Sequence, residues 1–288
     1  VQSVDAISKN ASTSQYGNIV AFDESPLKEG LLYAGTDDGL IHVSRDAGAN
    51  WTKIDKLPGI HDKAYVSFVL ASRHDEGTVF ATFDNHKMAD FKPYVLKSTD
   101  YGATWISMVE GLPENGPVWV IKEDHVDKNL LFLGNEFGVY TSNNGGAKWV
   151  RLKGGVPTIA VRDIAVQREE DDLVLGTFGR GFYILDDYSS LRNMGQDVLE
   201  KDAHIFDIPD ALIFAPATDR GIKSQGSTYY SAKNPHFGAT FTYYLKEGHK
   251  TLKQQRRKAE KKAYKDGKTP PYPSYEELRA EDTEEKHY

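Results

Sequence analysis

An octapeptide with the pattern Ser-x-Asp-x-Gly-x-x-Trp occurs twice in this chain and returns once in a weaker form. The copies are SRDAGANW (44–51), STDYGATW (98–105) and SNNGGAKW (142–149). The aligned positions Asp46, Asp100 and Asn144 follow one another at spacings of 54 and 44 residues, close to the roughly 40 to 50 residues of one propeller blade. The sequence therefore predicts a supersecondary unit that is repeated along the chain.

Each repeat reads as four strands separated by polar turns. The first strands are apolar and rich in β-branched residues, as buried strands require, and they cover residues 17–22, 65–72, 118–123 and 161–167. The third strand runs into the octapeptide and the fourth leaves from its Trp. A fourth copy, LVLGTFGRGFYILDD (173–187), has no octapeptide; terminal repeats are commonly atypical. We therefore expect an all-β fold, a β-propeller segment of about four blades of four antiparallel strands.

The octapeptide residues suit a tight turn between two strands. Asp accepts hydrogen bonds from backbone N–H groups, Gly adopts positive φ, and Trp packs its apolar face between strands. A calcium site is the alternative, but one Asp per copy supplies too few oxygen ligands. We interpret these positions as structural: Ser44, Asp46, Gly48, Trp51, Ser98, Asp100, Gly102, Trp105, Ser142, Asn144, Gly146 and Trp149.

These octapeptides resemble the Asp-box, also called the bacterial neuraminidase (BNR) repeat. The run from about Gly17 to Asp187 is similar to the sortilin-type propellers and their secreted bacterial glycosyl-hydrolase-like relatives. That resemblance implies a propeller followed by a β-sandwich, whose start the residues YSAKNPHFGATFTYYLKEG (230–248) resemble. It says little about activity, because sialidases, xyloglucan hydrolases, sortilin receptors and photosystem assembly factors all carry Asp-boxes, and fold does not fix function.

Four segments are predicted along the chain. Residues 1–16 are interpreted as the end of an upstream segment, since propellers have about four to eight blades and further blades are expected upstream. The propeller blades cover 17–193 and a linker covers 194–230. Residues 231–288 begin an incomplete β-sandwich-like domain, with a strand from Phe237 and a charged helical hairpin in which Ser274 and Glu277 form a capping box.

The turns opposite the octapeptides are the predicted binding face. In a four-stranded meander the second-to-third turns and the links between blades lie on one face, and the octapeptides lie on the other. The first spacing exceeds the second by ten residues, and the insertion that this implies is placed in the second of these turns, at 84–92; long loops of this kind often bind ligands. The candidate binding residues are Asp37, Asp38, Asp84, His86, Glu136, Phe178 and Arg180. Asp37 and Asp38 also suit a plain hairpin turn, and Arg180 can instead pair with Asp186 or Asp187.

Composition limits the classes of function. The chain has no cysteine, which excludes thiolate chemistry and Cys-based zinc sites, and no His pair has metal-ligand spacing. We expect no metal or cofactor and no catalytic residue that the sequence identifies. The net charge of −7 argues against nucleic-acid binding, and no apolar run is long enough to span a membrane.

The sequence favours a secreted or cell-surface module that binds protein or glycan, in an extracellular, periplasmic or cell-surface location. The alternative is a glycoside hydrolase, sialidase-like or xyloglucanase-like, whose catalytic carboxylates lie partly outside this chain. A third interpretation is a subunit of a larger surface assembly.

Overall fold

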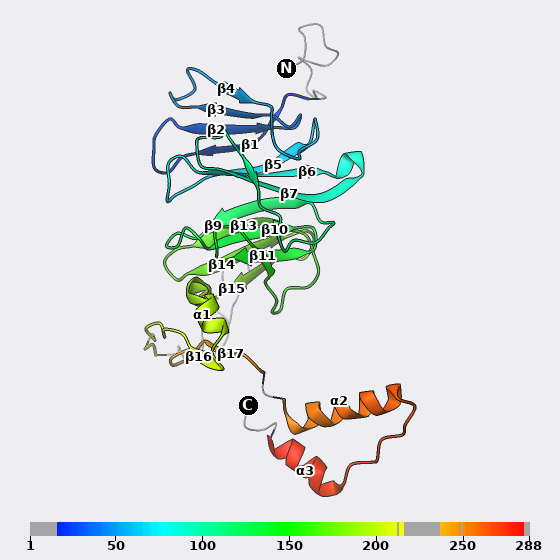
Figure 1. Ribbon diagram of the computed structural model, residues 1–288. Helices are drawn as coiled ribbons and strands as arrows, with labels where there is room; N and C mark the ends of the chain where they lie inside the picture. Colours follow the sequence, from blue (N-terminus) through cyan, green and yellow to red (C-terminus); the bar gives the residue numbers. More distant parts are fainter. Residues whose placement is uncertain (1–15, 212, 216–236, 249, 285–288) are drawn as a thin grey trace, which may run out of the picture. The chain divides into compact units, whose positions relative to one another are not determined.

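The structure is a computed structural model that describes residues 16–211, 213–215, 237–248 and 250–284. The chain divides into two compact units, with the boundary between Gly195 and Gln196. The first unit is built of antiparallel sheets, each a meander in chain order (Figure 1). Most of the predicted segment 1–16 and part of the predicted linker, 216–230, lie outside the described residues.

The first unit contains four sheets. The first sheet has strands β1 (Ile19–Glu24), β2 (Leu32–Thr36), β3 (Ile41–Ser44) and β4 (Thr52–Ile54). The second has β5 (Tyr65–Ala71), β6 (Val79–Asn85), β7 (Asp90–Ser98) and β8 (Ile106–Ser107), with the 3₁₀ turn η1 (His86–Met88) between β6 and β7. The third has β9 (Val118–Glu123), β10 (Leu131–Asn135), β11 (Gly138–Ser142) and β12 (Val150–Arg151). The fourth has three strands, β13 (Val161–Gln167), β14 (Asp172–Thr177) and β15 (Phe182–Leu185).

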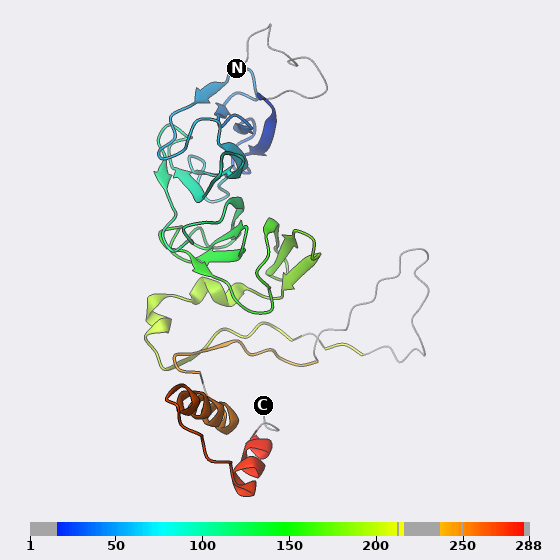
Figure 2. The same ribbon diagram turned by 90° about the vertical axis from the view of Figure 1, so that its right-hand side faces the viewer.

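This succession of sheets makes the chain an all-β protein with a β-propeller segment. The first strands lie side by side, β1 against β5, β5 against β9 and β9 against β13 (Figures 1 and 2). One apolar cluster fills the space between each pair of neighbouring sheets. The four predicted blades are thus present, the last with three strands among the described residues.

The octapeptides form the turns between the third and fourth strands, and their hydrogen bonds repeat. The Ser98 hydroxyl accepts the Gly102 N–H (2.8 Å), and the Asp100 carboxylate accepts the Thr104 N–H (2.8 Å). In the third copy, the Ser142 hydroxyl accepts the Gly146 N–H (3.0 Å) and the Asn144 amide oxygen accepts the Lys148 N–H. The turn therefore keeps its geometry when the carboxylate is replaced by an amide.

Two of the three octapeptide tryptophans pack against the sheet that precedes their own. Trp105 belongs to the cluster between the first and second sheets, and Trp149 to the cluster between the second and third. The Trp149 indole N–H donates to the Met108 carbonyl of the preceding sheet's last segment (2.8 Å). Trp51, in the first sheet, is 42% exposed. The tryptophan thus joins two sheets where a preceding sheet is present.

In the fourth sheet, which has no octapeptide, Tyr188 packs against the preceding sheet. Its ring is 1% exposed and lies edge-on to Phe132 of the third sheet, with ring centroids 5.0 Å apart. Its N–H donates to the Asp171 carbonyl (2.8 Å) in the turn between β13 and β14. A tyrosine outside any octapeptide therefore packs the fourth sheet against the third, and the octapeptide pattern gives no sign of it.

The insertion at 84–92 was predicted to be a loop, and this prediction is wrong. β6 extends to Asn85 and β7 begins at Asp90, so the two strands pair to the tip of a long hairpin. Asp90 stabilises the tip, because its carboxylate accepts hydrogen bonds from the Tyr94 hydroxyl (2.6 Å) and the Asn85 amide (3.2 Å). The Gly116 N–H also donates to the Phe91 carbonyl (2.7 Å). Polar side chains that bond one another across the hairpin explain why a turn-like composition forms strands.

The second unit is small. It contains α1 (Gln196–Leu199), the paired strands β16 (Ala203–Ile205) and β17 (Tyr243–Leu245), and helices α2 (Leu252–Lys265) and α3 (Tyr275–Glu284). The predicted strand from Phe237 is wrong in extent, because Tyr243–Leu245 alone pairs, against a partner strand of three residues. The helical hairpin is present, with the predicted Ser274–Glu277 capping box and an Arg256–Glu281 ion pair. No helix among the described residues is long and apolar enough to cross a membrane.

Candidate functional site

The octapeptides and the first-to-second turns share one face of the first unit. In each of the three sheets with an octapeptide, a backbone N–H of the octapeptide donates to a carbonyl of the first-to-second turn. The pairs are Ala47 to Gly30 (3.0 Å), Tyr101 to Gly77 (2.8 Å) and Gly145 to Asn129 (2.9 Å). All three donors have positive φ. Positive φ is unfavourable for Ala47 and Tyr101, and these cross-turn bonds hold the backbone there.

The second-to-third turns lie with the links between sheets. Their backbone N–H groups donate to the residues that lead into the first strand of the same sheet: Asp37 to Asn18 (3.1 Å), Glu136 to Pro117 (3.1 Å) and Phe178 to Ala160 (2.9 Å). These residues define a second face, which we call the link face. It is the face on which the sequence placed its candidate binding residues.

A β-bulge recurs at the link-face end of every first strand. The ladder with the second strand skips one residue in each sheet, namely Val20, Ser67, Trp119 and Arg162. A bulge re-aims the side chain of the extra residue and is frequent beside functional sites. In the third and fourth sheets the re-aimed residues are a Trp and an Arg.

Trp119 and Arg162 are the centre of a group that we call the Trp119 cluster, with Glu136, Phe178 and His86. The Arg162 guanidinium lies 3.5 Å from the centroid of the Trp119 ring and 5.3 Å from that of Phe178. The Trp119 indole N–H donates to the Glu136 carboxylate (3.0 Å), and the His86 ring lies edge-on to Trp119 at 6.0 Å. Three sheets thus contribute side chains to one cluster on the link face.

Arg162 keeps donors free within this cluster. Its Nη2 lies 3.4 Å from the Glu136 Oε2, a long ion pair between two partly exposed groups that contributes about 0–1 kcal/mol. Among the described residues, no other hydrogen bond of the guanidinium is formed. Stacking on Trp119 fixes the plane of the guanidinium, and such a plane can bind a carboxylate through two parallel hydrogen bonds.

A second group on the link face surrounds a cavity of about 400 Å³ lined by Asp37, Tyr65, Asp84, Lys63 and Lys87, among others. Asp37 accepts the Gly17 and Asn18 N–H groups, at 2.8 and 3.0 Å. Burial raises the pKa of Tyr65, and the negative charges of Asp37 and Asp84 raise it further.

Asp84 is bonded within its own hairpin. It is buried, and its carboxylate accepts the His86 N–H (3.0 Å) and pairs with His86 Nδ1. The carboxylates of Asp37 and Asp84 therefore already accept hydrogen bonds from within the chain.

The predicted site residues divide between these groups. His86, Glu136 and Phe178 belong to the Trp119 cluster, and Asp37 and Asp84 line the cavity. Asp38 accepts a hydrogen bond from Thr36 and faces a different cavity, beside Lys53 and His61. Arg180 forms no ion pair with Asp186, Asp187 or any other part of the chain that the structure describes.

Sequence reasoning missed Trp119 and Arg162. Both were assigned to first strands, where alternation gives no reason to single them out. The bulges that single them out follow from the pairing of two strands, and the pattern of one strand gives no signal of them.

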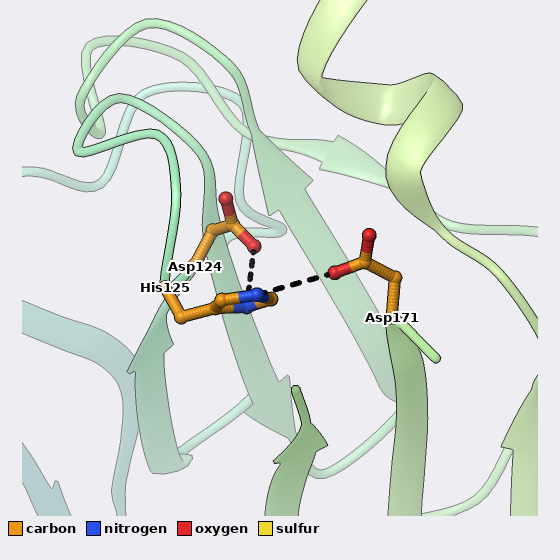
Figure 3. Close-up of side chains that lie close together, drawn as sticks. All are labelled: Asp124, His125 and Asp171. Carbon is orange, nitrogen blue, oxygen red and sulfur yellow. Dashed lines mark ion pairs between the residues drawn. The ribbon is translucent and has the colours of Figure 1, made fainter. Parts of the chain in front are cut away.

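Asp124, His125 and Asp171 lie close together (Figure 3). They belong to first-to-second turns, on the face that carries the octapeptides. His125 lies 3.5 Å from Asp124 and 3.4 Å from Asp171. Arg192 donates to both carboxylates, at 2.8 Å to Asp124 and 2.7 Å to Asp171, and the Tyr188 hydroxyl donates to Asp124 (2.6 Å). These donors fill the oxygens that a metal would need, so the group does not fit a cation.

The charge of Asp124 is stabilised within this group. Burial disfavours ionisation, but the hydrogen bonds from Arg192 and Tyr188 outweigh it, so the pKa of Asp124 lies well below its ordinary value of 3.8. The same bonds attach the 3₁₀ segment η2 (Ser189–Asn193) to the third and fourth sheets. The group is a structural anchor.

Comparison with known proteins gives structural likeness only. No family model and no curated protein matches the chain. Among solved structures, it is similar to YCF48 bound to D1 peptide, with 14% identity and a TM-score of 0.46, covering 59% of this chain and 51% of that one. It is also similar to the GH74 xyloglucanase from Xanthomonas campestris, with 13% identity and a TM-score of 0.47, covering 60% and 30%.

The GH74 enzyme of Niastella koreensis is similar at 14% identity and a TM-score of 0.49, covering 59% of this chain and 29% of that one. The chain therefore spans about half the length of the first of these structures and less than a third of the two enzymes.

Proposed function

We propose that this chain is a binding module whose link face takes a carboxylate-bearing ligand on the Trp119 cluster. The observation that carries the proposal is the Arg162 guanidinium, which is stacked on Trp119 and has donors that no described residue uses. Phe178, 70% exposed beside it, offers apolar contact to a neighbouring group of the ligand. Arg and Trp are the residues that most often dominate binding energy at interfaces.

The ligand class that this arrangement favours is a protein segment with an acidic side chain or a terminal carboxylate next to an apolar residue. An acidic glycan offers the same carboxylate, and a neutral glycan offers none. The three are separated by titrating the protein with acidic peptides, uronic-acid oligosaccharides and xyloglucan oligosaccharides. Our proposal expects peptide binding, weaker binding of the acidic glycan and none of the neutral one.

The test is calorimetric titration of the protein and its variants. Arg162→Ala is expected to weaken binding at least tenfold, which corresponds to about 1.4 kcal/mol, and Arg162→Lys to recover only part, because an ammonium cannot form the two parallel bonds. Arg180→Ala is the matched control, an arginine on the same face outside the cluster. Equal loss in both alanine variants, or none in Arg162→Ala, would contradict the proposal.

Glycoside hydrolysis is the second candidate, and the observation that favours it is that Asp37 and Asp84 line one cavity. A glycosidase needs two carboxyl groups about 5 Å apart for retention or about 6.5–9.5 Å apart for inversion. The test is release of reducing ends from xyloglucan and sialylated oligosaccharides. Activity that Asp37→Asn and Asp84→Asn each abolish would support the hydrolase; activity unaffected by both, or no activity, would reject it for this chain.

We also propose that the protein is secreted or lies at the cell surface, so that it binds its carboxylate-bearing partner outside the cytoplasm. Protease added to intact cells is expected to digest the protein. Protection from protease in intact but not in lysed cells would contradict this part of the proposal and leave the binding test unaffected.

A further inference from the structure

A cavity of about 440 Å³ lies between the first strands, toward the octapeptide face. All four sheets contribute to it, through β1, β5, β9 and β13 or the turns that follow them. Three cationic side chains line it, Arg73, Lys122 and Arg168, and we call it the basic cavity. It shares no lining residue with the Trp119 cluster or with the link-face cavity.

The carboxylates of the basic cavity are already bonded. Asp23 accepts the Ala71 N–H (2.8 Å), which joins β1 to β5. Glu123 accepts the Ser72 hydroxyl (2.9 Å) and the Arg73 N–H (2.9 Å), which joins β9 to the end of β5. Burial raises the pKa of both carboxyl groups, and their hydrogen bonds oppose that rise.

Two further acidic residues line the cavity and are also bonded. Glu24 accepts the Gly30 N–H (2.9 Å), and Asp163 accepts the Ile164 N–H (2.8 Å). The acidic residues therefore hold the backbone of the cavity wall together.

The cationic side chains, in contrast, form no close ion pair within the described parts of the chain, although Glu123 and Asp124 act on the charge of Arg73 and Asp23 acts on that of Lys122. The Lys122 ammonium lies over the Phe68 ring, 4.5 Å from its centroid. Burial lowers the pKa of Arg73 and the positive charge of Arg168 lowers it further, whereas the negative charges of Glu123 and Asp124 raise it. Two guanidinium groups that repel each other in one cavity leave a place for a negative charge.

We propose that the basic cavity binds a tetrahedral oxyanion, a phosphate or sulfate group, held by Arg73, Arg168 and Lys122. Three cations on separate strands or turns suit an acceptor that has oxygens in several directions better than a planar carboxylate. The cavity volume lies within the roughly 300–1,000 Å³ of small-molecule sites, which leaves room for a group such as a sugar attached to the oxyanion. The site is independent of the proposed function of the link face.

The experiment is calorimetric titration with sodium phosphate and sodium sulfate at constant ionic strength, with sodium chloride as the reference salt. Glucose 6-phosphate and a 6-sulfated monosaccharide then distinguish the two sources of the oxyanion. We expect saturable binding of at least one of these oxyanions and at least a tenfold weaker affinity in Arg73→Ala and in Arg168→Ala. Arg180→Ala is the control and should bind as the unchanged protein does.

Thermal unfolding shows whether a variant loses affinity because its fold is less stable or because the anion site is lost. Without an anion, Arg168→Ala is expected to be no less stable than the unchanged protein, because it removes the repulsion on Arg73. With saturating phosphate, the unchanged protein should gain thermal stability and the Arg73→Ala/Arg168→Ala variant should not. Oxyanion effects equal to those of chloride, or equal affinity in the double variant, would overturn the proposal.

Discussion

The first and third sheets carry the same octapeptide turn and differ in what the turn does. In both, the Ser hydroxyl accepts the N–H of the Gly four residues on, at 2.8 Å for Ser44 and 3.0 Å for Ser142. Trp51 is nevertheless 42% exposed, whereas Trp149 is 1% exposed. The hydrogen-bonded turn is therefore a local structure, and burial of its tryptophan depends on a preceding sheet.

The same two sheets place their negative charge in different turns. Ser25 and Asp124 are equivalent, since each donates its N–H across the first-to-second turn at 2.9 Å, to Leu31 and to Leu130. The first sheet thus has a hydroxyl in this turn and a carboxylate, Asp46, in its octapeptide. The third has a carboxylate here and an amide, Asn144, in the octapeptide. A charge is tolerated in either turn, and buried Asp124 has Arg192 as its partner.

The largest effect is expected from Trp105→Ala. Trp105 is 8% exposed between the first and second sheets, and removal of a buried Trp costs about 3–5 kcal/mol of the free energy of unfolding. Trp105→Phe is the control that keeps an aromatic ring and loses the N–H bond to Gly102. Urea unfolding measures both, and a loss below about 1 kcal/mol in Trp105→Ala would show that the tryptophan does not join the sheets.

A smaller loss, about 3 kcal/mol, is expected from Arg192→Ala. Removing one partner of a buried ion pair costs about 3–5 kcal/mol because the other charge stays buried and unpaired, and Arg192 is 15% exposed. Asp124→Ser/Arg192→Ala, which gives the third sheet the serine of the first, should recover part of that loss. A double variant less stable than Arg192→Ala would contradict this account of Asp124.

The contribution of Asp124 is expected to depend on pH. Its pKa in the folded protein is lower than in the unfolded chain, so its stabilising effect is present above about pH 4, near the ordinary Asp value. The effect is lost as the pH falls toward the lower folded pKa. The difference in unfolding free energy between the unchanged protein and the double variant should therefore shrink below pH 4. A difference that stays constant to pH 2 would contradict it.

The smallest effect is expected from Asp100→Asn, which gives the second octapeptide the amide of the third. Hydrogen bonds from Thr104 and Ser98 lower the pKa of Asp100 to about 2. Asn144 accepts the bonds from the serine and from the backbone N–H without a charge, whereas Asp100 also accepts the Thr104 hydroxyl (2.6 Å). The variant should therefore keep the turn, weaken the bond to the Thr104 hydroxyl and lose the acid sensitivity of Asp100 between about pH 4 and pH 2. Amide chemical shifts of residues 98–105 across that range test it; a displaced turn at neutral pH would contradict it.

Much of the fold was predictable because a repeat shows its own register. The octapeptides marked the third-to-fourth turns, and the first strands were found from apolar runs. The tip of the long hairpin was missed because Asn85 and Asp90 have turn composition. Their pairing is supported by the Tyr94 side chain in the same hairpin and by Gly116 in another segment. Tyr188 was missed because its packing partner, Phe132, is a tertiary contact.

The sequence predicted the face on which the candidate site lies, but it did not predict the residues that form the Trp119 cluster there. Topology placed Glu136 and Phe178 on the link face, but the residue between them, Arg162, is brought there by a β-bulge. A bulge depends on the pairing of two strands, and a single strand's pattern does not reveal it. The basic cavity could not be predicted either, because its cations come from three separate sheets.

The central claim, that the octapeptide tryptophan joins a sheet to the one before it, is tested most directly by comparing Trp51→Ala with Trp149→Ala. Both variants remove the same side chain from the same hydrogen-bonded turn. In urea unfolding of this chain, Trp149→Ala is expected to lose about 3–5 kcal/mol and Trp51→Ala less than about 1.5 kcal/mol, since its ring is already 42% exposed. Equal losses in the two variants would contradict the claim.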